Sequence, residues 1–236
     1  IYPLDVKEIW IERSSEILPG VWTFGYFDGL TRLVLTYCTI SNFNSLVPPP
    51  VLTNLLIAYH KSSTFTPNFT SSMTNLTTYQ INSSDTLSTT TADLSGTILN
   101  WVNIYSNTQL SNITLTLPSA TGTLTDIDIF SNKQSSITTI TLNGGGVNAL
   151  MSYTTLTGIT VNNNRLDTWT YRLPNSLKSF EAQFNRSGTL GGIPNFNVDL
   201  TNNTNLNYID LESNALTSIS TTIINCTSLK IGRAHV

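Results

Sequence analysis

The chain has few residues whose types and spacing suit covalent or acid–base chemistry. It contains two histidines, His60 and His235, and two cysteines, Cys38 and Cys226, in 236 residues. The cysteines form neither a disulfide framework nor a spaced pair of metal ligands, so we expect both to be buried small apolar residues. A zinc site would need carboxylates at no recognisable spacing. The sequence therefore predicts no metal and no cofactor.

Asp126 and Asp128 are the carboxylates best placed to act as a pair. Alternate positions of one strand more often form a solvated face than an acid–base pair. The sequence contains no G-x-S-x-G elbow, and the run Gly144-Gly-Gly is not followed by the lysine of a phosphate loop. We therefore predict that the chain is not an enzyme, and that it has no catalytic residues.

The amino-acid composition excludes several other classes of protein. Charged residues make up 11% of the chain, the net charge is −3, and Asn, Ser and Thr together exceed a third of it. A nucleic-acid-binding protein normally carries a basic patch, so we expect no nucleic-acid partner. A hydrophobic content of 39% argues against disorder, and no apolar run is long enough to suggest a membrane span.

Internal repeats decide the fold. Eight segments follow the pattern L-x-x-L-x-L-x-x-N, beginning at Leu30, Leu52, Leu76, Leu99, Leu124, Leu156, Leu177 and Leu206. A ninth unit begins at Leu229. Most starts lie 21 to 25 residues apart, with wider gaps after Leu124 and Leu177. Over about residues 30–230 the chain therefore resembles the leucine-rich-repeat family.

The resemblance implies a β-rich leucine-rich-repeat solenoid, of the α/β class by family, with a parallel concave sheet and few helices. The apolar fourth and sixth places of each unit predict strands near 33–35, 55–57, 79–81, 102–104, 127–129, 159–161, 180–182 and 209–211. The alternation at 110–115 and 137–142 predicts short extra strands on an otherwise irregular convex side.

The ninth place of each unit is predicted to form a structural ladder, in which side-chain amides satisfy the backbone groups of adjacent turns. The predicted ladder residues are Cys38, Asn107, Asn132, Asn164, Asn185 and Asn214. His60 and Ser84 occupy the same place in weaker units.

The places between the apolar ones are expected to face solvent on the concave sheet and to bind a ligand. The candidate ligand-binding residues are Tyr37, Tyr59, Trp101, Tyr105, Asp126, Asp128, Phe130, Phe184, Tyr208, Asp210 and Glu212. Asn54, Asn103, Asn162, Asn163 and Glu181 lie among them. Exposed rings beside amides and carboxylates suit a protein partner, and they also suit a carbohydrate ligand.

Residues 1–29 are predicted to be an N-terminal cap or the end of an upstream domain. The array covers 30–230 in about nine units, of which the last is truncated. Residues 231–236 resemble a translated sequencing adapter, so we expect a non-native tail. The Thr-, Asn- and Ser-rich return segments are similar to repeats of bacterial surface proteins and phage virion fibres. This resemblance implies an extracellular, cell-surface or virion setting.

Two functions from different classes follow from the solenoid. The first is a protein- or glycan-binding adhesion module that uses the concave face. The alternative is a structural spacer of a phage tail fibre or a larger surface protein. A third reading makes the array the recognition arm of an enzyme whose catalytic domain is absent.

Overall fold

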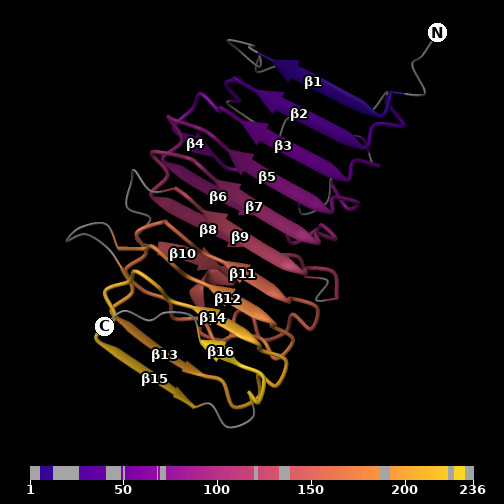
Figure 1. Ribbon diagram of the computed structural model, residues 1–236. Helices are drawn as coiled ribbons and strands as arrows, with labels where there is room; N and C mark the ends of the chain where they lie inside the picture. The colour runs from indigo at the N-terminus through magenta and orange to yellow at the C-terminus, as the bar shows by residue number, and fades with distance from the viewer. Residues whose placement is uncertain are drawn as a thin grey trace.

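The computed structural model describes residues 6–12, 27–40, 49, 51–67, 69, 73–119, 122–132, 139–186, 192–222 and 226–231. The chain coils into a β-solenoid of the leucine-rich-repeat type, in which each coil adds one strand to a parallel sheet (Figure 1). The described residues contain almost no helix; η3 (Asn143–Gly145) is a single 3-10 turn. The predicted fold class is confirmed.

The main sheet has ten strands in the order β1-β2-β3-β5-β7-β9-β11-β12-β14-β16. Their bounds are β1 (Glu8–Glu12), β2 (Arg32–Thr36), β3 (Asn54–Ala58), β5 (Thr78–Asn82), β7 (Trp101–Tyr105), β9 (Asp126–Phe130), β11 (Gly158–Thr160), β12 (Ser179–Glu181), β14 (Tyr208–Asp210) and β16 (Lys230–Ile231). Neighbours pair in parallel, so equivalent places of successive repeats lie side by side, as Val102 does with Ile127. All eight predicted strands are present.

A second set of strands lies on the return side of the coils. It consists of β4 (Thr64–Phe65), β6 (Thr89–Asp93), β8 (Asn112–Thr116) and β10 (Thr139–Leu142), with a separate pair, β13 (Asn195–Asp199) and β15 (Ser218–Thr222). The predicted extra strands near 110–115 and 137–142 are β8 and β10. The other four strands were not predicted.

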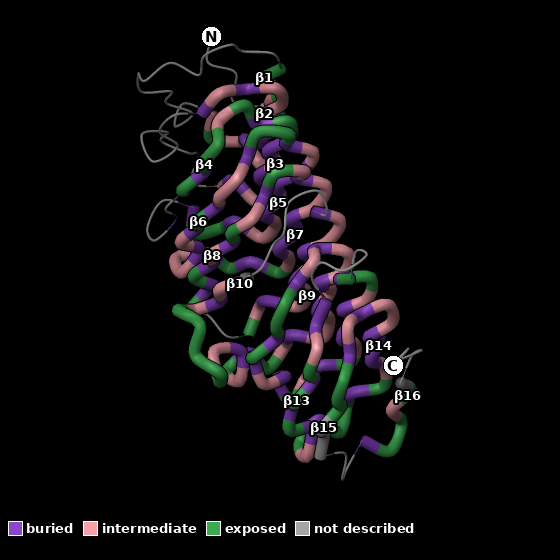
Figure 2. Tube along the Cα trace, turned by 90° about the vertical axis from the view of Figure 1, so that its left-hand side faces the viewer, coloured by how far each residue is buried: buried purple, intermediate pink, exposed green. Residues whose placement is uncertain are grey.

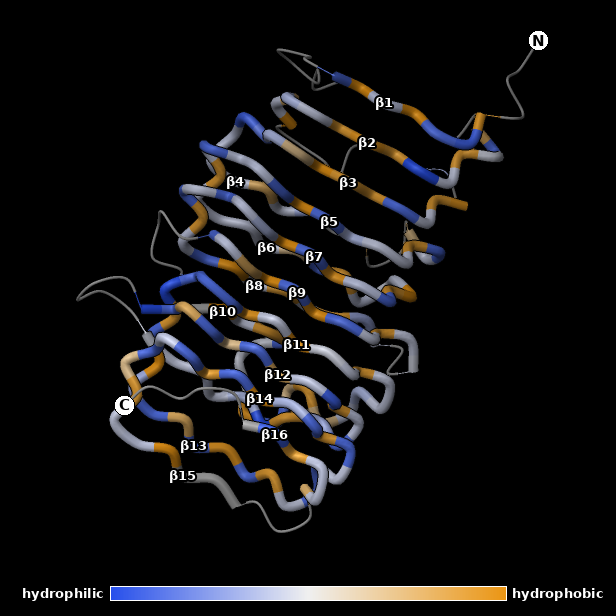
Figure 3. The backbone as a smooth tube through the Cα atoms, in the orientation of Figure 1, coloured by the Kyte–Doolittle hydropathy of each residue, from blue (hydrophilic) through white to orange (hydrophobic). Residues whose placement is uncertain are grey.

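The core lies between the two strand layers. The fourth and sixth places of the repeats, such as Ile127 and Ile129, are fully buried, and so is the leucine at the first place. Figure 2 shows buried segments recurring along the solenoid, and Figure 3 shows hydrophobic segments recurring along the strands. Both cysteines are buried thiols.

Threonine hydroxyls tie successive coils together at the second place of the repeat. Thr53 donates to the carbonyl of Thr31, and Thr77 donates to that of Thr53. Thr125 and Thr157 continue the series farther along the chain. These hydroxyls satisfy carbonyls at the edge of each coil, which explains part of the chain's high threonine content.

The ninth-place side chains form a continuous series of hydrogen bonds. The Oδ1 atom of Asn132 accepts a hydrogen bond from the backbone N–H of Asn107 at 2.9 Å. In the same way, the Oδ1 atom of Asn107 accepts one from the backbone N–H of Ser84. Asn164 accepts from Asn132, and Asn185 accepts from Asn164. Each of these asparagines is fully buried. The amide groups of Asn107, Asn132 and Asn164 also donate to the carbonyls of Ile81, Ile104 and Ile129 in the preceding coil, whereas the amide of Asn185 donates to Ala182 in its own coil.

The series changes at both ends. Ser84 replaces asparagine and accepts the N–H of His60 through its hydroxyl. The Cys38 thiol donates to the Thr36 and Ile11 carbonyls. Asn214 accepts the N–H of Ile193 instead of that of the preceding asparagine.

The eighth place has a left-handed backbone in each of the eight repeats that begin at Leu30 to Leu206. Its residues, with φ between 53° and 60°, are Tyr37, Tyr59, Ser83, Ser106, Ser131, Asn163, Phe184 and Ser213. Side chains with a Cβ atom are strained there, whereas glycine is not. The sharp turn leads the chain out of the strand and places the ninth residue inside the coil.

We expect Ser106→Gly to stabilise the protein by about 0.5 to 1 kcal/mol, because it removes this strain at a half-buried hydroxyl with no side-chain hydrogen bond. Ser95→Gly, in a turn with negative φ, should instead destabilise through the greater freedom of the unfolded chain. Urea unfolding of both variants measures the difference. A loss of stability in Ser106→Gly would contradict the strain argument.

The ends of the array are partly outside the described residues. Within 1–29, β1 adds a strand in register with β2, so the sheet starts before Leu30. Within the predicted tail, Ile231 pairs with Ile209 in β14, and 232–236 lie outside the described residues. In the ranges that the structure describes, no helix is long and apolar enough to cross a membrane.

Candidate functional site

The outward surface of the main sheet, here called the main-sheet face, consists of the third, fifth and seventh places of the repeats. Parallel in-register pairing arranges these places in rows, so Gln80, Asn103 and Asp128 are neighbours on successive strands. The inward side chains form the core cluster, and the outward side chains of this face are not part of it. The residue types of this face therefore carry the most information about function.

Of the candidate ligand-binding residues, Trp101, Tyr105, Asp126, Asp128 and Phe130 come together on adjacent strands β7 and β9. The rings of Tyr105 and Phe130 stack with centroids 5.1 Å apart and planes at 4°. The indole N–H of Trp101 donates to a carboxylate oxygen of Asp128 at 2.7 Å. This cluster is the centre of the main-sheet face.

Tyr37 and Tyr59 lie toward the N-terminal end, one coil apart. Their rings stack with centroids 4.3 Å apart and planes at 2°. The Lys61 ammonium group lies 5.4 Å from the Tyr37 ring centroid, within range of a cation–π interaction. Tyr59 remains 38% exposed. The pair is separate from the central cluster, because β5 lies between them in the sheet.

The remaining candidates lie toward the C-terminal end. The Tyr208 hydroxyl donates to Asp210 at 2.7 Å, and this hydrogen bond to the carboxylate raises the pKa of Tyr208 to about 12. The phenol is therefore a neutral donor at physiological pH. Phe184, at an eighth place, is 43% exposed. Glu212 is half-buried beside Asp210.

Two residues predicted to face solvent are buried. Asp210 is 6% exposed, because the Tyr208 hydroxyl and the backbone N–H of Glu212 cover its oxygens. Asn103 is 5% exposed. A period-two pattern gives the face of the sheet on which a side chain lies, but flanking large side chains decide whether water reaches it. These two expectations of exposure were wrong, although both residues lie at outward places.

Sequence reasoning missed the polar residues that hold the cluster in place. The amide groups of Gln80 and Asn82 donate to the Tyr105 hydroxyl oxygen at 3.1 and 2.9 Å. Gly158 pairs with Asp126 in the register, and a Cβ atom there would lie 2.4 Å from an Asp126 carboxylate oxygen. The Asp126 side chain therefore lies across β11. The sequence did offer a signal for these residues. They occupy outward places of neighbouring repeats, so a comparison of those places across adjacent strands would have placed them beside the cluster.

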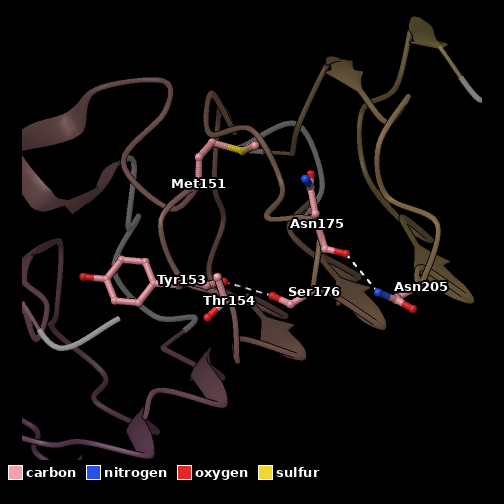
Figure 4. Close-up of a pocket in the computed structure, with 6 residues that line it drawn as sticks. All are labelled: Met151, Tyr153, Thr154, Asn175, Ser176 and Asn205. Atoms are coloured by element: carbon pink, nitrogen blue, oxygen red, sulfur yellow. Dashed lines mark hydrogen bonds between the residues drawn. The ribbon is translucent and has the colours of Figure 1, made fainter. Parts of the chain in front are cut away.

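A pocket of about 280 Å³ lies away from this face, among the turns that precede the strands (Figure 4). It is lined by Met151, Tyr153, Thr154, Asn175, Ser176 and Asn205. The Ser176 hydroxyl donates to the Tyr153 carbonyl, and the Asn205 amide donates to that of Asn175. The Tyr153 hydroxyl donates to the Pro118 carbonyl and accepts a hydrogen bond from the Asn143 amide. The lining offers no group that would favour acid–base chemistry.

His60, the one described histidine, is buried at its ladder place. Burial lowers the pKa of its imidazole, so the ring is neutral at physiological pH. Among the described residues, no three His, Cys, Asp or Glu side chains gather as metal ligands do.

No family model matches the chain, and no curated protein matches it by sequence. Among solved structures, the chain is similar to an internalin from Listeria monocytogenes, with 10% sequence identity over 98% of this chain and 87% of that one. The TM-score is 0.24. A likeness at this level assigns neither a family nor a ligand to this chain.

Proposed function

We propose that this protein is a non-enzymatic recognition module that binds a protein or a glycan through the main-sheet face. The observation that carries the proposal is the central cluster on β7 and β9, where a stacked ring pair and two carboxylates lie together. Rigid rings bury a large area with little loss of rotamer entropy, and side chains already held by hydrogen bonds lose less on binding. The proposed setting is extracellular, at a cell surface or on a virion, in keeping with the low charge and the Thr-, Asn- and Ser-rich coils.

A structural role is the alternative, as a spacer in a fibre or a larger surface protein. One observation favours it: sheet register and ninth-place hydrogen bonds continue from coil to coil, with Asn107, Asn132, Asn164 and Asn185 in series. Such a series makes a stiff rod. A spacer has no need of stacked rings on one outward face, and this favours the recognition module.

The experiment compares Trp101→Ser/Phe130→Ser with the wild-type protein on a glycan array and against a displayed library of random peptides. We expect selected ligands to bind the double variant at least about tenfold more weakly, since two aromatic contacts are lost. Val147→Ser is the control, because Val147 is 52% exposed in a turn away from this face. Equal binding by the double variant and the wild type would contradict the proposed face, and selection of no ligand at all would favour the spacer.

A further inference from the structure

The main-sheet face is anionic between β3 and β14. Its outward strand positions there include Asp126, Asp128, Glu181 and Asp210, with Glu212 just after β14, and no lysine or arginine. The cations at equivalent places are Arg32 in β2, which pairs with Glu8 at 2.6 Å, and Lys230 in the last strand. Lys178 comes one position before β12 and therefore lies outside the strand.

Several hydrogen-bond donors of this face are used within it. The Trp101 indole donates to Asp128, and the Tyr208 hydroxyl donates to Asp210. The amides of Gln80 and Asn82 both donate to the Tyr105 oxygen.

Several hydrogen-bond acceptors of this face have no donor among the described residues. The Asp126 carboxylate accepts no hydrogen bond from any described residue, and Asp128 uses one of its two oxygens. Asn103, between them and β5, is 5% exposed, and its side-chain oxygen has no partner in the described structure. Buried polar atoms are nearly always hydrogen-bonded, so the Asn103 oxygen is one further acceptor of this face that the described residues leave unused.

The aromatic rings of the face also favour a cationic ligand. At the N-terminal end, the chain places its own cations on exposed rings, with Arg32 5.5 Å from the Trp10 ring centroid and Lys61 on Tyr37. The Tyr105–Phe130 pair and Phe184 have no such cation among the described residues. Ring faces attract guanidinium and ammonium groups, most strongly where water is excluded.

We infer that the ligand is an arginine- or lysine-rich segment of another protein, bound on β7 to β14; this inference rests on the proposed function. A guanidinium group is donor-only and cationic, so it satisfies leftover acceptors, carboxylates and ring faces together. A neutral glycan supplies hydroxyls that donate and accept equally, and it leaves the negative charge without a counterpart. The five strands from β7 to β14 span about 19 Å at the usual strand spacing, so an extended segment of six to ten residues would cover them.

The test uses three dye-labelled peptides: five Arg-Gly repeats, five Gln-Gly repeats and five Glu-Gly repeats. Alternate residues of an extended peptide point to one side, so the arginines can all face the protein. Fluorescence anisotropy measures each dissociation constant for the 236-residue chain at two salt concentrations. We expect binding of the arginine peptide alone, weakening as salt rises.

Two variants locate the binding. Asp126→Asn/Asp128→Asn should weaken arginine-peptide binding by about tenfold or more, since each removes a charge that a bound guanidinium contacts. The control Asp85→Asn/Asp167→Asn makes the same change in net charge at exposed residues outside the strands, and should change the affinity by less than about twofold. Asn103→Leu should weaken binding while leaving the melting temperature unchanged or higher, because it removes an unpartnered buried acceptor.

Each outcome decides the inference. Equal losses in the two double-aspartate variants would show unspecific attraction of a polycation, and would overturn it. Binding of array glycans without binding of the arginine peptide would also overturn it, while the proposed recognition function would stand. If neither the array glycans nor the arginine peptide binds, and no other ligand for the face is found, the proposed function is overturned as well. Weak binding by an Asn103→Leu variant that melts at a lower temperature would count against a ligand role for Asn103.

Discussion

Asn132→Ala is expected to lower the free energy of unfolding by about 3 kcal/mol, since each buried polar group left without a partner costs about 1 to 3 kcal/mol. The Asn132 oxygen accepts from both the backbone and the side-chain N–H of Asn107. Its amide donates to Ile104 and to Asn164. Alanine removes all four bonds in a region closed to water, because Asn107, Asn132 and Asn164 are fully buried. The shift of the urea unfolding midpoint measures the effect.

Asn112→Ala is the matched control. Asn112 is exposed in β8, and its amide makes one long contact, 3.4 Å to the Ser111 hydroxyl. Its replacement should change stability by less than about 0.5 kcal/mol. If the two variants unfold at the same urea concentration, the ninth-place hydrogen bonds do not hold the coils together.

The main sheet could be predicted from the sequence because its signal repeats. Apolar side chains, mostly leucine, isoleucine or valine, recur at the first, fourth and sixth places, and eight strands follow from stacking those places. The second sheet was harder to predict. β6 reads Thr-Thr-Thr-Ala-Asp, in which only the register with β8 shows that Thr90 and Ala92 point inward. Its strand character depends on neighbours in space and not on its own hydrophobic pattern.

The candidate site was predictable in outline only. The repeat places put Trp101, Asp128 and Phe130 on one outward face before any coordinates were known. The pairings between coils were not predictable, because they depend on rotamers and on residues more than 20 positions apart. The stacking of Tyr105 on Phe130 is one such case. The burial of Asn103 at an outward place is another.

Gly192→Ala is expected to lower the free energy of unfolding by about 3 kcal/mol, from two causes that act together. Gly192 is buried and has φ = 94°, a conformation that side chains with a Cβ atom rarely adopt. A Cβ atom there would lie 2.8 Å from the backbone nitrogen of Ala215, closer than real Cβ atoms approach backbone. The clash cannot be relieved by turning a flexible side chain.

The position is also fixed by hydrogen bonds on both sides. The Gly192 N–H donates to the Leu166 carbonyl at 3.0 Å, and the next N–H, that of Ile193, donates to Asn214 in the ninth-place series. A backbone shift that made room for alanine would therefore weaken a buried contact between two coils. Gly122→Ala is the control, because Gly122 has no atom within 4 Å of a built Cβ and no positive φ. Its unfolding free energy should stay the same or rise by up to about 1 kcal/mol. Thermal or urea unfolding that is identical for the two alanine variants would mean that the chain can leave this turn without disturbing the Asn214 contact, and the coil would then be looser there than its hydrogen bonds indicate.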